Sequence, residues 1–342
     1  MVKDRYSYLD IAKGIGILMV VWAHIMLVGW SHQVCYAFHM PLFFFVSGML
    51  FDRNKYAGFS SFIGKRSRRL LLPYVIYSVI TWAIWAAFRF IRHDAVDSYI
   101  APLLQTIIAQ GSGAFLVHNS ALWFIPCLFV VEVMYYFISK LPEWLNVAVC
   151  IAMCALSFVL GHYLHNGWWL TPPFNFDAAL IALPFYSIGN MLIKYWPHDK
   201  LIDWAGSHKI ETIVFWAISS VAVILLALKF GECSMGSSSY ICSGAIFMVR
   251  AFVGIFSLLA FSLLISPLNL NLTKWFGRDS LDIMCLHIPV KGVVILVIAI
   301  ILGKNSDYVS SHWLPAILVF IVTMLTVSIL VQFINRYIRK QR

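Results

Sequence analysis

Charged residues are scarce in this chain of 342 residues, because Asp, Glu, Lys and Arg together make up only 12% of it. A soluble globular domain carries about 25%. Hydrophobic residues account for 61%, and they recur in apolar runs along the whole length. This composition leaves no room for a sizeable soluble domain. It predicts an all-α polytopic integral membrane protein embedded in a lipid bilayer.

Several motifs are also missing. The sequence contains no low-complexity segment, no tandem repeat, and no H-E-x-x-H, C-x-x-C or Walker A pattern. We therefore expect no metal site, no nucleotide hydrolysis and no permanently bound cofactor. The first apolar stretch, Tyr8–Trp30, is too long for the hydrophobic region of a signal peptide and lacks a small-residue cleavage site after it, so we expect no cleavable signal peptide.

The apolar runs predict about ten transmembrane helices in a single domain covering 1–342, with a short basic tail at 336–342. The segment 99–117 is less apolar and is expected to lie at the interface or to re-enter the membrane. The predicted spans are 8–30, 34–51, 71–91, 121–139, 146–163, 177–195, 210–229, 243–266, 280–302 and 313–335.

The formal net charge of +10 raises the possibility of a nucleic-acid partner. If the N-terminus is cytoplasmic, the outer connections hold only Arg92 and Lys304 of the lysines and arginines outside the spans. Positive charge gathers in cytoplasmic segments of membrane proteins. This distribution predicts that both termini are cytoplasmic and excludes a nucleic-acid partner. The inner segments are 1–7, 52–70, 140–145, 196–209, 267–279 and 336–342.

Most of the seven cysteines lie in spans and are expected to behave as small apolar residues. Cys233 instead sits in the predicted outer loop "KFGECSMGSSSYICSG", with Cys242 at its far end. In an oxidising periplasm they could form a disulfide. The alternative is two reduced cysteines.

The first span carries Asp10, Lys13 and His24, although ionisable groups at membrane depth are costly and usually functional. Lys13 and His24 are eleven residues apart, so on a helix they share one face about 16 Å apart along the axis. They therefore serve different depths of one cavity or interface. Asp10 and Lys13 are three residues apart and can pair with each other.

His39 in the second span is predicted to lie at a depth similar to that of His24. A short connection joins the two spans, so the two imidazoles could face one another. The plain alternative for each is a packed, hydrogen-bonded histidine. Two histidines at matching depth favour a site.

Arg66 and Arg69 form an R-x-x-R pattern in the predicted inner loop "KRSRRLLLPY". One interpretation is topological, because basic residues flank spans on the cytoplasmic side. The other is a phosphate site, since arginine offers a bidentate fork to phosphate oxygens.

Glu132 lies deep in apolar sequence and needs a partner, for which Arg250 and Lys291 are the candidates. His287 is four residues before Lys291 and so shares its helix face.

Four stretches resemble, in the right order, the membrane-bound acyltransferase family 3, in the branch of fucose 4-O-acetylase-like and exopolysaccharide O-acetyltransferases. The stretches are "DIAKGIGILMVVWAH", "FHMPLFFFVSGMLF", "LWFIPCLFVVE" and "FGRDSLDIMCLH". The resemblance implies about ten helices in a bacterial inner membrane and O-acetylation of a polysaccharide or lipid-linked sugar from acetyl-CoA or another acyl-CoA. The hydrolase-like periplasmic domain of some members is not expected here.

The family signature of a basic residue, ten residues and a histidine falls on Lys13 and His24. Its R-x-x-R pattern falls on Arg66 and Arg69, and its tryptophan-to-glutamate pattern falls loosely on Trp123 and Glu132. The resemblance therefore implies catalytic roles for His24, His39 and Glu132, and donor or substrate binding by Lys13, Arg66, Arg69, Trp123 and His287.

A sugar hydroxyl needs a general base to attack a thioester, and histidine has the chemistry for that role. We expect His24 to be this base, either in direct transfer or through a covalent acyl-enzyme. A transporter of a glycan or small solute would also carry ionisable residues inside the membrane. A third alternative is a structural partner in a glycan-synthesis complex, for which the polar face would be superfluous.

Overall fold

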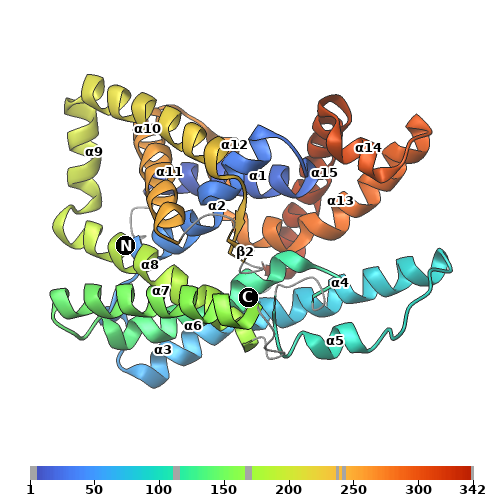
Figure 1. Cartoon of the computed structure of the whole chain (residues 1–342), viewed down its shortest axis with the longest axis horizontal. Helices are drawn as coiled ribbons and strands as arrows, with labels where there is room; N and C mark the ends of the chain where they lie inside the picture. Colours follow the sequence, from blue (N-terminus) through green and yellow to red (C-terminus); the bar gives the residue numbers. More distant parts are fainter. Residues whose placement is uncertain (1–5, 111–115, 166–171, 236–238, 241–243, 340–342) are drawn as a thin grey trace. The chain divides into compact units, whose positions relative to one another are not determined.

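The computed structural model describes residues 6–110, 116–165, 172–235, 239–240 and 244–339. These residues are almost entirely helical, which confirms the predicted all-α membrane class (Figure 1). A single two-stranded sheet joins β1 (Cys233–Ser234) and β2 (Ser239–Tyr240) within the described chain.

Long helices match each predicted span. They are α1 (Ser7–Ile25), α2 (Trp30–Met49), α3 (Phe59–Arg66) continued by α4 (Leu72–Ile91), α6 (Phe124–Ile138), α7 (Glu143–His165), α8 (Phe176–Tyr195), α10 (Lys209–Phe230), α11 (Gly244–Ile265), α13 (Ser280–Leu302) and α15 (Trp313–Phe333). The shorter elements are the 3-10 turns η1 (Arg53–Lys55), η3 (Ser120–Trp123) and η4 (Pro173–Asn175), the π-helical turns η2 (Ser67–Leu71) and η5 (Ile334–Arg339), and the helices α5 (Ala101–Gln105), α9 (His198–Ser207), α12 (Asn271–Arg278) and α14 (Ser306–Ser311).

Eight helical stretches among the described residues are long and apolar enough to cross a membrane. The remaining two predicted spans correspond to α2 and α7, which are helical but do not belong to that set. The first span ends at Ile25 rather than at residue 30. The third begins far earlier than residue 71, because Phe59–Ile91 is one continuous helical stretch. Much of the expected inner loop 52–70 is therefore helix.

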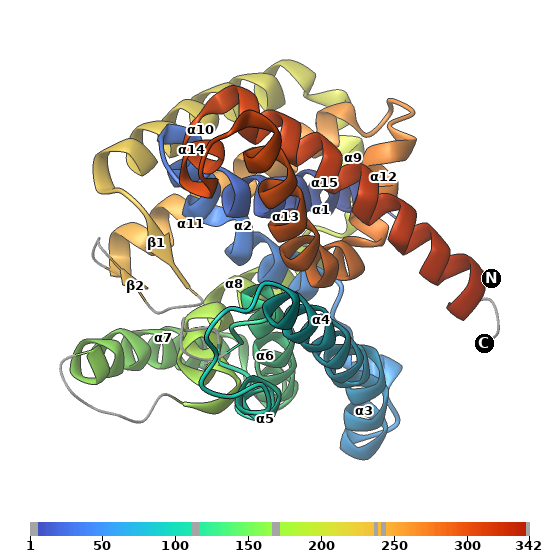
Figure 2. The ribbon, with the colours of Figure 1, turned by 90° about the vertical axis from the view of Figure 1, so that its right-hand side faces the viewer.

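The chain forms two compact units. Unit 1 comprises Met1–Phe43, Trp196–Cys233 and Ile241–Arg342, and unit 2 comprises Phe44–Tyr195 and Ser234–Tyr240. Within unit 1, α10 packs on α11, and α13 packs on α15 (Figures 1 and 2).

The connections of unit 1 that are predicted to lie outside meet one another. The backbone N–H of Leu27, between α1 and α2, donates to the carbonyl of Ser310 in α14 at 3.1 Å. His32, at the start of α2, contacts Glu232, just after α10, at 3.0 Å. Three connections separated widely in sequence thus lie at one end of the unit.

The segments of unit 1 that are predicted to lie inside also meet one another. The hydroxyl of Tyr8, at the start of α1, bonds to Nδ1 of His198 in α9 at 2.7 Å. Asn335, after α15, donates to the carboxylate of Asp279 at the start of α13 at 2.9 Å. Helices that thread a membrane alternately produce this sorting of connections. The side that faces the cytoplasm stays a prediction from charge.

Two glycines allow α1 and α12 to pack with their backbones in contact. A Cβ at Gly277 would overlap the carbonyl of Asp10, and a Cβ at Gly14 would overlap the carbonyl of Thr273. Small residues permit such close approach of helices in membranes. The glycines of "DIAKG" and "FGRD" therefore hold α12 against the charged end of α1.

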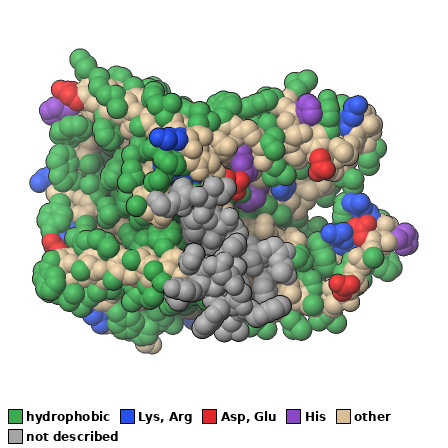
Figure 3. Space-filling model, viewed as in Figure 1, with side chains coloured by type: hydrophobic (Ala, Val, Ile, Leu, Met, Phe, Trp, Pro, Cys, Tyr) green, Lys and Arg blue, Asp and Glu red, His purple; other side chains and the backbone are tan. Residues whose placement is uncertain are grey.

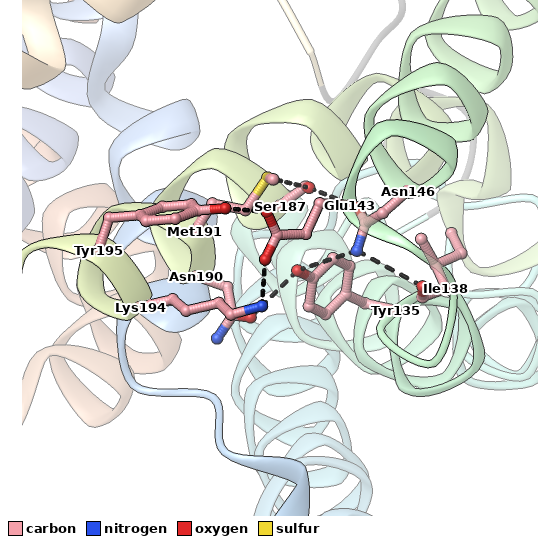
Figure 4. A network of polar contacts seen from close by, with 9 residues as sticks. All are labelled: Tyr135, Ile138, Glu143, Asn146, Ser187, Asn190, Met191, Lys194 and Tyr195. Carbon is pink, nitrogen blue, oxygen red and sulfur yellow. Dashed lines mark hydrogen bonds and ion pairs between the residues drawn. The ribbon is translucent and has the colours of Figure 1, made fainter.

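Unit 2 is tied together by polar side chains, some of them buried and some exposed (Figure 4). The Tyr135 hydroxyl in α6 donates to Asn190 in α8 at 3.1 Å. Asn190 donates in turn to the carbonyls of Gly48 and Phe51, at 3.2 and 2.8 Å. Buried polar groups are costly unless they are paired, so this network fixes the end of α2 against α6 and α8.

Hydrophobic side chains dominate the visible surface in Figure 3. Helix α10 illustrates the reason, since Ile210, Ile218 and Leu225 are 75%, 66% and 60% exposed. An apolar surface of this kind suits contact with lipid rather than water.

Candidate active site

The charges near the start of α1 are paired as the sequence predicts. Lys13 Nζ lies 2.9 Å from a carboxylate oxygen of Asp10, and Asp10 is only 5% exposed. Ile17 and Val20, on the face between Lys13 and His24, are buried at 0% and 1% exposure. That face is therefore packed rather than lining an open cavity, and the pair holds two charges inside unit 1.

Three histidines of unit 1, His24, His39 and His287, each use Nδ1 to bond to a carbonyl of their own helix. Nδ1 of His24 donates to the carbonyl of Val20 at 2.8 Å. Nδ1 of His287 donates to the carbonyl of Met284 at 2.8 Å, and His39 is tied in the same way to its own helix. Because a carbonyl can only accept, Nδ1 carries the hydrogen and Nε2 of the neutral ring carries the lone pair. Each Nε2 is thus able to accept a proton.

His24 and His287 meet directly. Their ring centroids are 5.0 Å apart at an interplanar angle of 66°. Nε2 of His287 is buried and has no hydrogen-bond partner among the described residues. Lys291, one turn further along α13, donates from Nζ to the backbone carbonyl of His24. The end of α1 and the middle of α13 therefore form one polar cluster inside apolar surroundings.

His39 lies within electrostatic range of His24. The expectation of similar depth rests on predicted spans 8–30 and 34–51, and the two helices end and begin elsewhere. His24 is instead the residue before the last of α1, whereas α2 begins at Trp30, nine residues before His39. Tyr36 packs edge-on against His39 with ring centroids 5.0 Å apart.

Glu132 pairs with Arg66 in unit 2. The guanidinium Nε lies 2.9 Å from a carboxylate oxygen of Glu132, and the two residues are 9% and 2% exposed. The expectation that Glu132 pairs with Arg250 or Lys291 is therefore wrong. Those cations instead donate to the carbonyls of Gly231 and His24.

The two arginines of the R-x-x-R pattern differ in exposure. Arg66 is buried in its ion pair, while Arg69 is exposed and within electrostatic range of Glu132. Both sit where α3 passes into the π-helical turn Ser67–Leu71. Such turns occur frequently at functional sites. Fully buried Tyr186 of α8 lies beside the Arg66–Glu132 pair.

Trp123 lies at the start of α6 and is 8% exposed. Its ring meets Phe124 edge to face at 6.2 Å, and Phe124 packs against Phe44 at 5.0 Å. The structure therefore places Trp123 in an aromatic cluster of unit 2. Its predicted part in substrate binding stays a prediction.

Sequence reasoning missed a second polar cluster in unit 1. Nε2 of His32 contacts Glu232, and Arg250 lies fully buried within electrostatic range of that carboxylate. The hydrogen bond from His32 holds the pKa of Glu232 below its ordinary value. The sequence held one sign of this cluster, since Arg250 is an arginine inside an apolar span and such residues are rare.

Two further predictions concern a metal site and a disulfide. Across residues 6–110, 116–165, 172–235, 239–240 and 244–339, no three His, Cys, Asp or Glu side chains are arranged to hold a metal ion. Cys233 is 2% exposed, but Cys242 lies outside the described residues, so the disulfide stays a prediction.

Comparison with known proteins gives one family and one relative. The model of a family described as an acyltransferase domain, Acyl_transf_3, matches residues 6–333. The chain is also 24% identical over 250 residues to nodulation protein NolL of Mesorhizobium japonicum, which covers 68% of this chain and 57% of that protein. The match thus spans little more than half of the relative's length. No solved structure is significantly similar to the chain.

Proposed function

Because this chain belongs to the acyltransferase 3 family, we propose that it is an O-acyltransferase that moves an acetyl group from acetyl-CoA to a hydroxyl of a bacterial surface or exported glycan. It works in the inner membrane, with both termini in the cytoplasm. The acceptor is a polysaccharide or a lipid-linked sugar.

The observation that carries the proposal is the His24 imidazole at the end of α1. Its Nδ1–H is held by the carbonyl of Val20, so its Nε2 lone pair can take the proton of an acceptor hydroxyl. The hydroxyl oxygen then bonds to the thioester carbonyl carbon, the bond to sulfur breaks, and the proton passes to the leaving CoA thiolate. Neighbouring His287 and His39 are bases of the same kind, which suits one site handling protons of both substrates.

The donor is held by the cytoplasmic basic residues. Arg69 is exposed and offers its guanidinium to CoA phosphates, which arginine binds through two parallel hydrogen bonds. Arg66 is already occupied by Glu132, so its part is to fix the helical turn that carries Arg69. Lys13 supports the inner end of α1 and is balanced by Asp10.

Isotope-labelled acetyl-CoA tests the proposal. Membranes from cells that express the chain and from cells that lack it are incubated with the labelled donor, and the glycans are analysed by mass spectrometry. We expect labelled O-acetyl esters only where the chain is present, removable by mild alkali. Equal labelling in both membranes, or a label found only on protein or lipid amines, would contradict the proposal.

A further inference from the structure

Arg250 is the largest side chain in the described structure with almost no exposed surface. It lies in α11, its exposure is 0%, and its guanidinium carbon sits 5.7 Å from the ring centroid of Phe247. Nη1 donates to the carbonyl of Gly231 at 2.6 Å. A buried guanidinium is charged at every physiological pH, so its other donors also need partners.

The remaining donors of Arg250 all lie on one edge. Nε and Nη2 have no hydrogen-bond partner among the described residues. These two nitrogens carry the parallel N–H groups that grip the two oxygens of a carboxylate or phosphate. The hydrogen bond to Gly231 therefore uses Nη1 and leaves the bidentate edge, Nε and Nη2, without a partner among the described residues.

Glu232, a carboxylate within electrostatic range of Arg250, already has a side-chain partner. His32 donates from Nδ1 to the carbonyls of Ala23 and Met26 at 3.0 and 2.8 Å, while its Nε2 lies 3.0 Å from Glu232 Oε2. The contact with His32 occupies one carboxylate oxygen of Glu232. The Nε and Nη2 donors of Arg250 are still without a hydrogen-bond partner among the described residues.

We propose that Arg250, with His32 and Glu232 beside it, forms a subsite for an anionic group on the acceptor, either a carboxylate or a phosphate. This rests on the proposed function and narrows its substrate class to an acidic or phosphorylated sugar. The subsite lies at the end of unit 1 where α1 ends and α2 begins, which the charge distribution predicts to face outward. The side chain of Glu232 is 39% exposed, whereas Arg250 and His32 are buried, so Glu232 is the side of the cluster that meets solvent.

Thermal unfolding of the full-length chain in detergent, without any donor, tests the subsite separately from catalysis. Glucuronate, glucose 6-phosphate and uncharged glucose are titrated against the wild-type chain and Arg250→Gln. We expect one or both anions, but not glucose, to raise Tm in the wild type. The anion that acts at lower concentration identifies the group. In Arg250→Gln the apparent Kd should weaken about 10–100-fold, the value of a charged hydrogen-bonded pair.

Two further variants keep the test decisive. Arg278→Gln removes an exposed arginine of α12 in the same unit and should leave anion binding unchanged. Glu232→Gln removes the competing carboxylate and should tighten anion binding, even where Arg250→Gln does not fold. Equal shifts with glucose and the anions, or unchanged anion affinity in both the Arg250 and the Glu232 variants, would overturn the subsite. Failure of acetyl transfer with intact anion binding would count against the proposed function alone.

Discussion

The imidazoles of His24 and His287 meet edge to face with centroids 5.0 Å apart, although they lie on helices at opposite ends of the chain. Each ring donates its Nδ1 hydrogen to its own helix backbone, so its Nε2 carries the lone pair. Lys291 fastens the carbonyl of His24 to α13, so the two rings are held in place together. This contact is the centre of the catalytic account.

Replacing both Arg66 and Glu132 should destabilise the fold less than the sum of the two single replacements. Replacing either partner leaves a buried charge without compensation, which costs about 3–5 kcal/mol of folding free energy. We therefore expect Arg66→Met and Glu132→Leu each to reduce the fraction that elutes as a folded monodisperse species. The double variant should recover much of that fraction. A double variant as unstable as the two single losses combined would show that the residues do not act as a pair.

Arg69 should act on the donor rather than on folding, because it is exposed. We expect Arg69→Ala to raise the KM for acetyl-CoA in membranes while kcat and protein level stay close to the wild type. Arg69→Lys should restore only part of the affinity, since lysine is a point charge without a fork. Exposed Arg336→Ala is the control. An unchanged KM in Arg69→Ala would show that this arginine does not bind the donor and only marks the cytoplasmic end of a span.

Gly277 should be needed for the contact between α12 and α1. A Cβ at this position overlaps the carbonyl of Asp10, so Gly277→Ala must push the helices apart at a cost of about 1–3 kcal/mol. Gly292→Ala in α13 is the matched control, because a Cβ there meets nothing within 4 Å. It should be neutral or slightly stabilising, as alanine favours helix. Equal Tm values for the two variants would contradict this packing.

His118 should make the chain sensitive to acid. Burial lowers its pKa from an ordinary 6.5 to about 4, and both ring nitrogens lack a partner within the described residues. Above about pH 6.5 the ring is neutral in both the folded and the unfolded chain. Between those values only the unfolded chain binds the proton, so stability falls as pH falls through that window.

His118→Gln should therefore lose less Tm between pH 7 and pH 4.5 than the wild type does. The matched control is exposed His208→Gln, which should keep the full pH dependence. An identical loss of Tm in His118→Gln and the wild type would show that this histidine is not buried in its neutral form.

The apolar runs located every long helix, because a span needs about twenty apolar residues and leaves a clear trace in composition. Short helices such as α9 and α12 left no such trace and were missed. The continuous helix Phe59–Ile91 was cut short, since its first turns are polar and read as a loop.

The candidate site was predictable by residue type but not by partner. His24, His39 and His287 stood out as imidazoles in apolar sequence, and Lys13 was correctly paired with Asp10 across one helical turn. The partner of Glu132 could not be found in this way, because several cations lie in or near the spans and only tertiary packing chooses among them. The contact between His32 and Glu232 forms because the connection before α2 meets the connection after α10. A local sequence pattern cannot predict such a contact.

The most direct test of the account is the rate of acetyl transfer by His24→Ala. Membranes that contain equal amounts of the wild type, His24→Ala and the exposed control His312→Ala, judged by immunoblot, are supplied with labelled acetyl-CoA and the native glycan acceptor. Loss of a general base predicts a rate lower by about 10²–10⁴-fold in His24→Ala and an unchanged rate in the control. A rate within a few-fold of the wild type in His24→Ala would contradict the assignment of His24 as the base.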